Sequence, residues 1–77
     1  MGYKTRGAKI QITIIKEATE IRLLANREGL RYLSEVIDEL LSEDYDPHKP
    51  PHAHVEPALN TAEAGSVPME IFLNPNF

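Results

Sequence analysis

Apolar residues between Arg27 and Glu43 recur every three or four positions, which is the spacing of one face of an α-helix. At about 100° per residue they occupy one arc of roughly 140°, and polar side chains occupy the opposite side. Asn26, directly before this stretch, suits the N-cap because its side-chain oxygen can accept a hydrogen bond from the first turn. The pattern predicts one amphipathic helix that buries its apolar arc against another element. The arc consists of Leu30, Leu33, Val36, Ile37, Leu40 and Leu41.

Four other segments alternate apolar and polar residues, with the period of two expected of strands that have one buried face. They span residues 8–16, 19–25, 52–56 and 67–74. Because the helix follows the second of them, the element order is β-β-α-β-β. This order predicts an α+β fold, in which a four-stranded, mainly antiparallel sheet carries the helix on one face. The strand order 2-1-3-4 would keep all neighbours antiparallel.

The predicted sheet has one face toward the helix and one face open. The open face mixes polar side chains with three large apolar ones, Ile15, Leu24 and Phe72. Such a face is either plain solvated surface or an interaction surface. The residues expected to point inward are Ile10, Ile12, Ile14, Ile21, Leu23, Ala25, Ala53, Val55, Val67, Met69, Ile71 and Leu73.

The chain has 77 residues and no cysteine. This length predicts a single domain, which we place at residues 8–75 after a flexible basic arm of residues 1–7. Without cysteine, no disulfide supports the fold and no thiolate serves as nucleophile or metal ligand. No apolar run approaches the roughly 20 residues that span a bilayer, and the first residues lack the apolar core of a secretion signal. We therefore expect a cytoplasmic protein with no membrane partner.

Charge is distributed unevenly along a chain whose net charge is −4. A net acidic chain repels nucleic acid, so nucleic acid is not the expected partner. Acidic residues crowd the C-terminal end of the predicted helix, where the helix dipole is itself negative. Their placement suggests a docking surface for a basic protein, the alternative being a solvated face that keeps the protein dissolved. The candidate partner-binding residues are Glu35, Asp38, Glu39, Glu43, Asp44 and Asp46.

The most specific chemical feature is the pair His52 and His54. On a strand they share one face, about 7 Å apart at Cα, so both imidazoles could bind one metal ion. His48 or Glu56 is the candidate third ligand. Zinc is the expected ion, followed by nickel or copper, because imidazole ligands suit all three. The alternative is the ordinary polar face of an exposed strand. We expect Ala53 and Val55 to face the core, which turns both histidines away from the helix.

The sequence carries no arrangement typical of an enzyme. Ser34 and Ser42 have no histidine at a matching spacing, and no glycine-rich phosphate loop is present. The neighbouring acids Asp38 and Glu39 lie on one helix face and cannot hold two carboxylates across a substrate. We therefore expect a non-enzymatic protein that needs no cofactor, apart from the candidate zinc ion.

The segment from residue 19 to residue 73 resembles the immunity protein thirty-two family, small bacterial proteins of polymorphic toxin systems. The resemblance lies in Glu28-Gly29-Leu30 and Leu33 of the helix, in the H-x-H of His52 and His54, and in the final strand Glu70-Ile71-Phe72-Leu73. The proline-rich loop before His52 departs from the family pattern. The resemblance implies a protein that binds and neutralises a cognate toxin, without catalysis.

Three functional hypotheses follow from these residues. The first is a small binding protein, such as a toxin-neutralising immunity protein, that docks a basic toxin domain through its acidic helix end and open sheet face. The second is a metal-binding protein built on the H-x-H strand. The third is an oligomeric structural domain that buries Ile15, Leu24 and Phe72 against a second copy.

Overall fold

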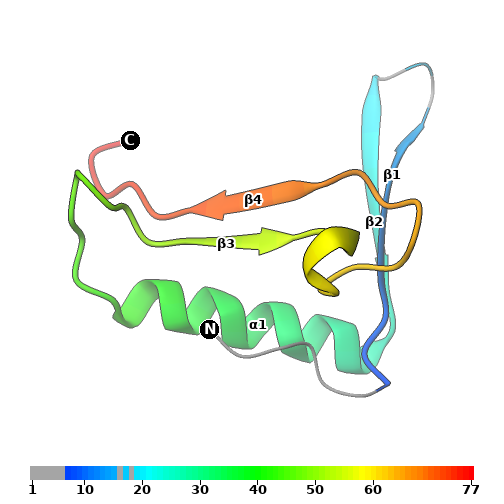
Figure 1. Ribbon diagram of the computed structural model, residues 1–77, viewed down its shortest axis with the longest axis horizontal. Helices are drawn as coiled ribbons and strands as arrows, with labels where there is room; N and C mark the ends of the chain where they lie inside the picture. Colours follow the sequence, from blue (N-terminus) through cyan, green and yellow to red (C-terminus); the bar gives the residue numbers. More distant parts are fainter. Residues whose placement is uncertain (1–6, 16, 18) are drawn as a thin grey trace.

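The computed structural model describes residues 7–15, 17 and 19–77 (Figure 1). Its element order is β-β-α-β-β, so the predicted α+β class and the predicted order are confirmed. The predicted basic arm falls almost wholly on residues 1–6, which lie outside the described residues. The elements are β1 (Ile10–Ile15), β2 (Glu20–Ala25), α1 (Arg27–Ser42), β3 (His52–Val55), the short 3-10 helix η1 (Pro57–Leu59) and β4 (Met69–Phe72).

The described strands form two antiparallel pairs, β1 with β2 and β3 with β4, and each pair is a separate two-stranded sheet. The predicted antiparallel pairing is confirmed, but the prediction of one continuous sheet in the order 2-1-3-4 is wrong. Figure 1 shows the β1–β2 hairpin standing across one end of α1 and of the β3–β4 pair. The predicted open face is divided too, because Ile15 and Leu24 lie on the hairpin and Phe72 lies on β4.

The sheets are separate because a loop segment, residues 63–67, occupies the second edge of β1. We call this segment the strap. The N–H of Glu63 donates to the carbonyl of Ile10, with an N–O distance of 2.7 Å, and the N–H of Val67 donates to the carbonyl of Ile12 at 2.8 Å. Both edges of β1 are therefore hydrogen-bonded, one to β2 and the other to the strap. At these residues β1 has no edge that β3 could join.

Side-chain oxygens of the strap complete this contact in place of a regular strand ladder. Ser66 Oγ accepts the N–H of Ile12 at 3.1 Å, and Glu63 Oε1 accepts the N–H of Ile10 at 3.3 Å. A buried backbone N–H without a partner would be costly, so these oxygens stabilise the junction. β4 begins only after the strap, which makes it shorter than the predicted strand 67–74.

Asn26 joins the hairpin to the helix, and its predicted role as N-cap is confirmed. Its Oδ1 accepts the N–H of Gly29 at 2.8 Å and the N–H of Lys9 at 2.9 Å. Its own N–H donates to the Lys9 carbonyl at 3.1 Å, while its carbonyl accepts the first helical N–H, from Leu30, at 3.0 Å. Asn26 therefore both ends the β1–β2 hydrogen-bond ladder and caps the start of the helix. Gly29 allows this close approach, because a Cβ there would collide with the Lys9 carbonyl.

The buried face of α1 is narrower than predicted. Leu30, Ile37 and Leu41 are exposed, so their predicted burial is wrong. The β3–β4 pair is only two strands wide and covers less of the helix surface than a four-stranded sheet would. The core consists of Ile10, Ile12, Tyr32, Leu33, Val36, Leu40, Ala53, Val55 and Ala62.

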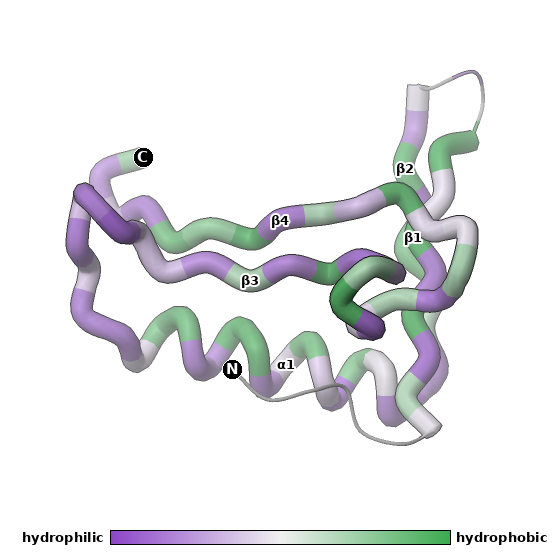
Figure 2. Tube along the Cα trace, viewed as in Figure 1, coloured by the Kyte–Doolittle hydropathy of each residue, from purple (hydrophilic) through white to green (hydrophobic). Residues whose placement is uncertain are grey.

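The hairpin is likewise covered at one end only. Ile10 and Ile12 are buried in the core. Further along the same face, Ile14, Ile21 and Leu23 are exposed, so their predicted burial is wrong as well. The cause is the crossed arrangement, in which the rest of the chain covers the helix end of the hairpin and not its outer end. Figure 2 shows hydrophobic segments continuing along the hairpin to the end remote from α1.

We predict that Asn26→Ala lowers the free energy of unfolding by at least about 2 kcal/mol, because the cap and the bond to Lys9 are both lost. Asn26→Asp should cost less than half as much. It keeps the accepting oxygen and loses only the amide donor that now reaches the Gly7 carbonyl at 2.7 Å. Urea unfolding followed by circular dichroism measures both. An alanine variant within about 0.5 kcal/mol of wild type would contradict this role.

Candidate functional site

Three large apolar side chains lie uncovered along one side of α1. The exposed fraction is 56% for Leu30, 48% for Ile37 and 68% for Leu41. Their spacing of seven and then four residues places them in one line along the helix, beside its buried face. We call this line the apolar stripe. Exposed apolar side chains aligned in this way are a candidate interaction surface.

The six acids predicted as a docking surface are all exposed. The structure brings Glu35, Asp38 and Glu39 together on α1, where they line one shallow depression. The last turn of the helix contains no basic residue, so no positive side chain there offsets the negative end of the helix dipole or the charge of these acids. The remaining acids follow at the helix end and on the next loop, namely Glu43, Asp44 and Asp46.

Tyr32 connects the acidic face with the core. The side chain is 4% exposed, and within the described part of the chain its hydroxyl has no hydrogen-bond partner. Burial raises the pKa of Tyr32 above its ordinary value of 10.0, and the negative charge of Glu39 raises it further. The periodicity of the sequence did not indicate this residue, because a tyrosine can lie at the border of an apolar arc without entering it.

Two histidines, two carboxylates and a phenyl ring share one face of the β3–β4 pair. The ring centroids of His52 and His54 are 5.1 Å apart. Ala53 and Val55, the residues on either side of His54 in the chain, are buried in the core. The predicted placement of both histidines on one face, turned away from the helix, is therefore confirmed. His54 Nδ1 lies 3.5 Å from Glu56 Oε2 and 3.6 Å from Glu70 Oε1. His52 stacks on Phe72, with the ring centroids 5.1 Å apart.

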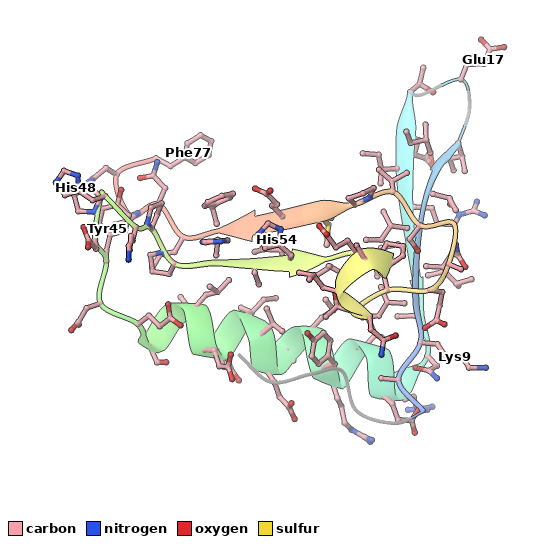
Figure 3. The ribbon with its side chains drawn as sticks, viewed as in Figure 1. Lys9, Glu17, Tyr45, His48, His54 and Phe77 are labelled. Carbon is pink, nitrogen blue, oxygen red and sulfur yellow. The ribbon has the colours of Figure 1, made fainter. Side chains whose placement is uncertain are left out.

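The third predicted ligand, His48, does not join His54. Figure 3 shows His48 on the loop at the far end of the molecule from the hairpin, well away from His54. His48 instead lines a surface depression together with His52. No three His, Cys, Asp or Glu side chains of the described residues are grouped so that they could hold a metal ion. The structure therefore does not assemble the predicted metal ligands into one site.

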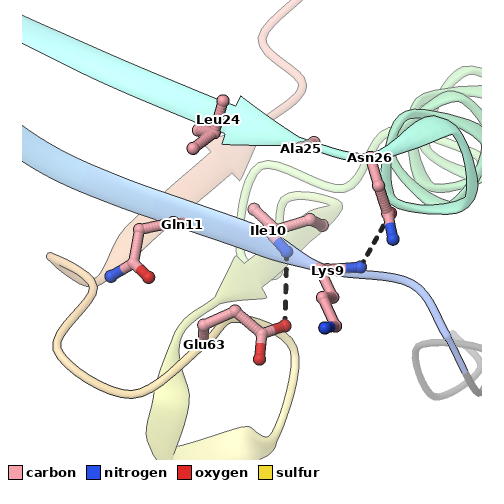
Figure 4. Close-up of a pocket in the computed structure, with 7 residues that line it drawn as sticks. All are labelled: Lys9, Ile10, Gln11, Leu24, Ala25, Asn26 and Glu63. Atoms are coloured by element: carbon pink, nitrogen blue, oxygen red, sulfur yellow. Dashed lines mark hydrogen bonds between the residues drawn. The ribbon is translucent and has the colours of Figure 1, made fainter.

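A pocket with a volume of 350 Å³ lies where the hairpin, the helix start and the strap meet (Figure 4). Its polar groups already hold backbone atoms, since Glu63 Oε1 accepts from Ile10 and Asn26 Oδ1 accepts from Lys9. The pocket is better explained as a structural junction than as a ligand site. The sequence could not indicate it, because its walls come from three separate segments. The lining residues are Lys9, Ile10, Gln11, Leu24, Ala25, Asn26 and Glu63.

The helix of the described region is too short and too polar to cross a membrane. Comparisons of the chain with protein-family models, with curated proteins and with solved structures give no match. The surfaces described above are therefore the basis for inferring function.

We predict that Tyr32→Phe raises the free energy of unfolding by about 1 kcal/mol, because it removes a buried hydroxyl without a partner. Because folding raises the pKa of Tyr32, the unfolded chain ionises first as the pH rises through about 10. Wild-type stability should therefore fall from that pH up to the folded-state pKa, and the variant should lack this fall.

Urea unfolding at about pH 8 and about pH 10.5 measures the effect on either side of the ordinary tyrosine pKa. Tyr45→Phe is the matched control and should keep the wild-type pH dependence. If the Tyr32 and Tyr45 variants lose the same stability between the two pH values, Tyr32 is not the residue responsible.

Proposed function

We propose that the protein is a small non-enzymatic binding protein that docks a partner protein on α1. The observation that carries this proposal is the apolar stripe, formed by Leu30, Ile37 and Leu41. It is exposed along a helix whose neighbouring surface is acidic in the C-terminal half. Protein interfaces typically place apolar side chains at the centre and charged side chains at the rim. The exposed surface of α1 has this composition.

The rotation of the helix supports this arrangement. Three successive residues, Val36, Ile37 and Asp38, step from the buried face to the apolar stripe and then to the acids, with about 100° between neighbours. A complementary partner would offer an apolar ridge flanked by basic side chains. Opposite charge on the two surfaces would speed the encounter, and the apolar contact would hold the complex together.

The kind of partner follows from the resemblance to the immunity protein thirty-two family. It would be a basic toxin domain, which the protein neutralises by binding it in the cytoplasm. This identification rests on the motifs of the sequence, whereas the surface of α1 argues more generally for a basic protein. The open face of β3–β4, with its histidines and acids, would provide further polar contacts.

The test uses the product of the gene next to the one that encodes this chain. We predict that this product inhibits bacterial growth, that co-expression restores growth, and that the two purified proteins bind. Leu41→Ser should weaken binding at least about tenfold, because it removes an interface apolar side chain. Glu43→Lys should slow association at low salt and reduce its salt dependence.

Matched controls separate this surface from general effects. Leu59→Ser removes an equally large exposed leucine from η1, and Glu17→Lys makes the same charge change at the hairpin tip. Both should bind as wild type does. If Leu41→Ser and Glu43→Lys also bind as wild type does, α1 is not the docking surface. If the neighbouring product does not bind at all, the toxin identification is wrong.

Metal binding is a second candidate, which the orientation of both imidazoles favours. His52 Nδ1 lies 3.0 Å from the Pro50 carbonyl, and His54 Nδ1 faces Glu56 and Glu70. A carbonyl can only accept, so Nδ1 of His52 is the donor in this hydrogen bond. Histidines that bind metals typically direct one nitrogen to such an oxygen and offer the other to the ion. Each histidine therefore has its Nε2 atom left to serve as a ligand.

We predict that zinc added to the metal-free protein at about pH 7.5 gives a binding heat in calorimetry that the double variant His52→Ala/His54→Ala lacks. His48→Ala tests whether the loop histidine moves in as a third ligand and should reduce the affinity if it does. Equal heats from wild type and the double variant would mean that His52 and His54 are ordinary surface side chains.

A further inference from the structure

The backbone of β2 has hydrogen-bonding groups that point away from the protein. Ile10 and Ile12 on β1 direct their N–H and carbonyl groups to the strap. Successive residues of a strand direct their backbone N–H and carbonyl groups toward opposite edges. The residues of β1 between these isoleucines are therefore the ones whose backbone groups bond to β2. In the observed register, Ile21 and Leu23 stand opposite Ile14 and Ile12 and so direct their N–H and carbonyl groups outward.

This outer edge is a complete strand edge. Within the described part of the chain β2 pairs with β1 alone, and its six residues include no proline and no lysine. Natural proteins usually protect such an edge with proline, with charged side chains such as lysine, with a bulge or with a covering segment. The charged residues of β2, Glu20 and Arg22, have opposite signs and so do not repel a second copy in every register. Next to the edge, Ile14 is 51% exposed and Ile21 is 66% exposed on one face of the hairpin. Edge and face together make a surface suited to strand addition.

We propose that β2 pairs with β2 of a second copy of this chain, antiparallel across a two-fold axis. The product is a dimer with a four-stranded sheet in the order β1-β2-β2-β1. This surface is separate from α1 and does not depend on the proposed function. It also differs from the oligomer predicted from the sequence, because Ile14 and Ile21 lie on the opposite face of the hairpin from Ile15 and Leu24.

Charge complementarity selects the register of this pairing. The outward N–H and carbonyl groups of two β2 strands can pair when the two-fold axis passes through Ile21, through Arg22 or through Leu23. With the axis at Ile21, Glu20 of each copy stands opposite Arg22 of the other, which gives two attractive pairs. With the axis at Arg22, two arginines face each other, which is destabilising. With the axis at Leu23, each arginine faces Leu24 and gains no charge partner.

The selected register also matches the apolar face. Ile14 stands opposite Ile21 within each hairpin. With the axis at Ile21, the four strands therefore carry one continuous cross-strand row of four isoleucines, Ile14 and Ile21 from each copy. β-Branched side chains in directly opposed positions stabilise antiparallel sheets. The pairing thus gives Ile21 of each copy an apolar cross-strand neighbour that a single chain does not supply.

The test begins with the mass of the full chain in sedimentation equilibrium. Wild type should shift from one chain to two as concentration rises. Arg22→Glu and Glu20→Arg each place like charges opposite one another and should weaken dimerisation at least about tenfold. The exchange variant Glu20→Arg/Arg22→Glu restores both attractive pairs and should recover the wild-type affinity, which also shows that the changed strand still folds.

A crosslink then locates the axis. The chain has no cysteine, so each single-cysteine variant carries one thiol. Ile21→Cys should oxidise to a covalent dimer, because directly opposed residues of a hydrogen-bonded pair lie about 5.5 Å apart at Cα, within disulfide range. Leu24→Cys, which does not stand opposite its own equivalent across this axis, should remain a single chain at the same concentration.

Three results would overturn the proposal. One is a mass of one chain at every concentration. Another is a dimer whose affinity is unchanged by both Arg22→Glu and Glu20→Arg. The third is crosslinking at Leu24 that equals or exceeds crosslinking at Ile21, because it would place the contact elsewhere on the hairpin.

Discussion

The hydrogen bonds between the strap and β1 hold this fold together. Glu63 and Val67 donate to the carbonyls of Ile10 and Ile12, and strap side chains accept the N–H groups of the same two isoleucines. Those isoleucines are buried, so leaving their polar groups without partners would be costly. Because the strap satisfies them, β1 becomes an interior strand although it belongs to a two-stranded sheet. The hairpin is thereby tied across the end of the β3–β4 pair.

This constraint determines which surfaces stay open. A sheet of two strands covers a narrow part of α1 and leaves Leu30, Ile37 and Leu41 exposed. A hairpin held at one end leaves Ile14 and Ile21 exposed at the other. The two exposed apolar surfaces lie on different elements, and each has its own electrostatic setting. The apolar surface on α1 lies beside acidic residues, which favours a basic partner. The apolar surface at β2 lies beside one acidic and one basic residue, which favours pairing with a second copy.

The periodic features of the fold could be predicted from the sequence. The strand segments, the helix, the Asn26 cap and the outward histidines each follow from a local repeat or from one residue type at a boundary. The division into two sheets could not be predicted, because it depends on the strap. Small and polar residues from 63 to 66 carry no strand pattern, and two of the strap's contacts use side-chain oxygens.

The extent of burial was also beyond the reach of periodicity. Leu33 and Ile37 both lie within the predicted arc, about 40° apart, yet only Leu33 is buried. Which of them is covered depends on the width of the sheet, a property of the whole fold. The same limit applies to the candidate site, because the acids could be found from the sequence, whereas the apolar stripe beside them could not be told from the core.

The central claim is that the strap closes one edge of the hairpin while β2 remains open for association. Amide hydrogen exchange, followed by NMR at low and high protein concentration, tests it most directly. We expect the amides of Glu63 and Val67 to be protected at every concentration. We expect those of Ile21 and Leu23 to exchange rapidly in dilute solution and to become protected as the concentration rises. Rapid exchange of Val67 in dilute solution, or unprotected Ile21 and Leu23 amides at high concentration, would contradict the claim.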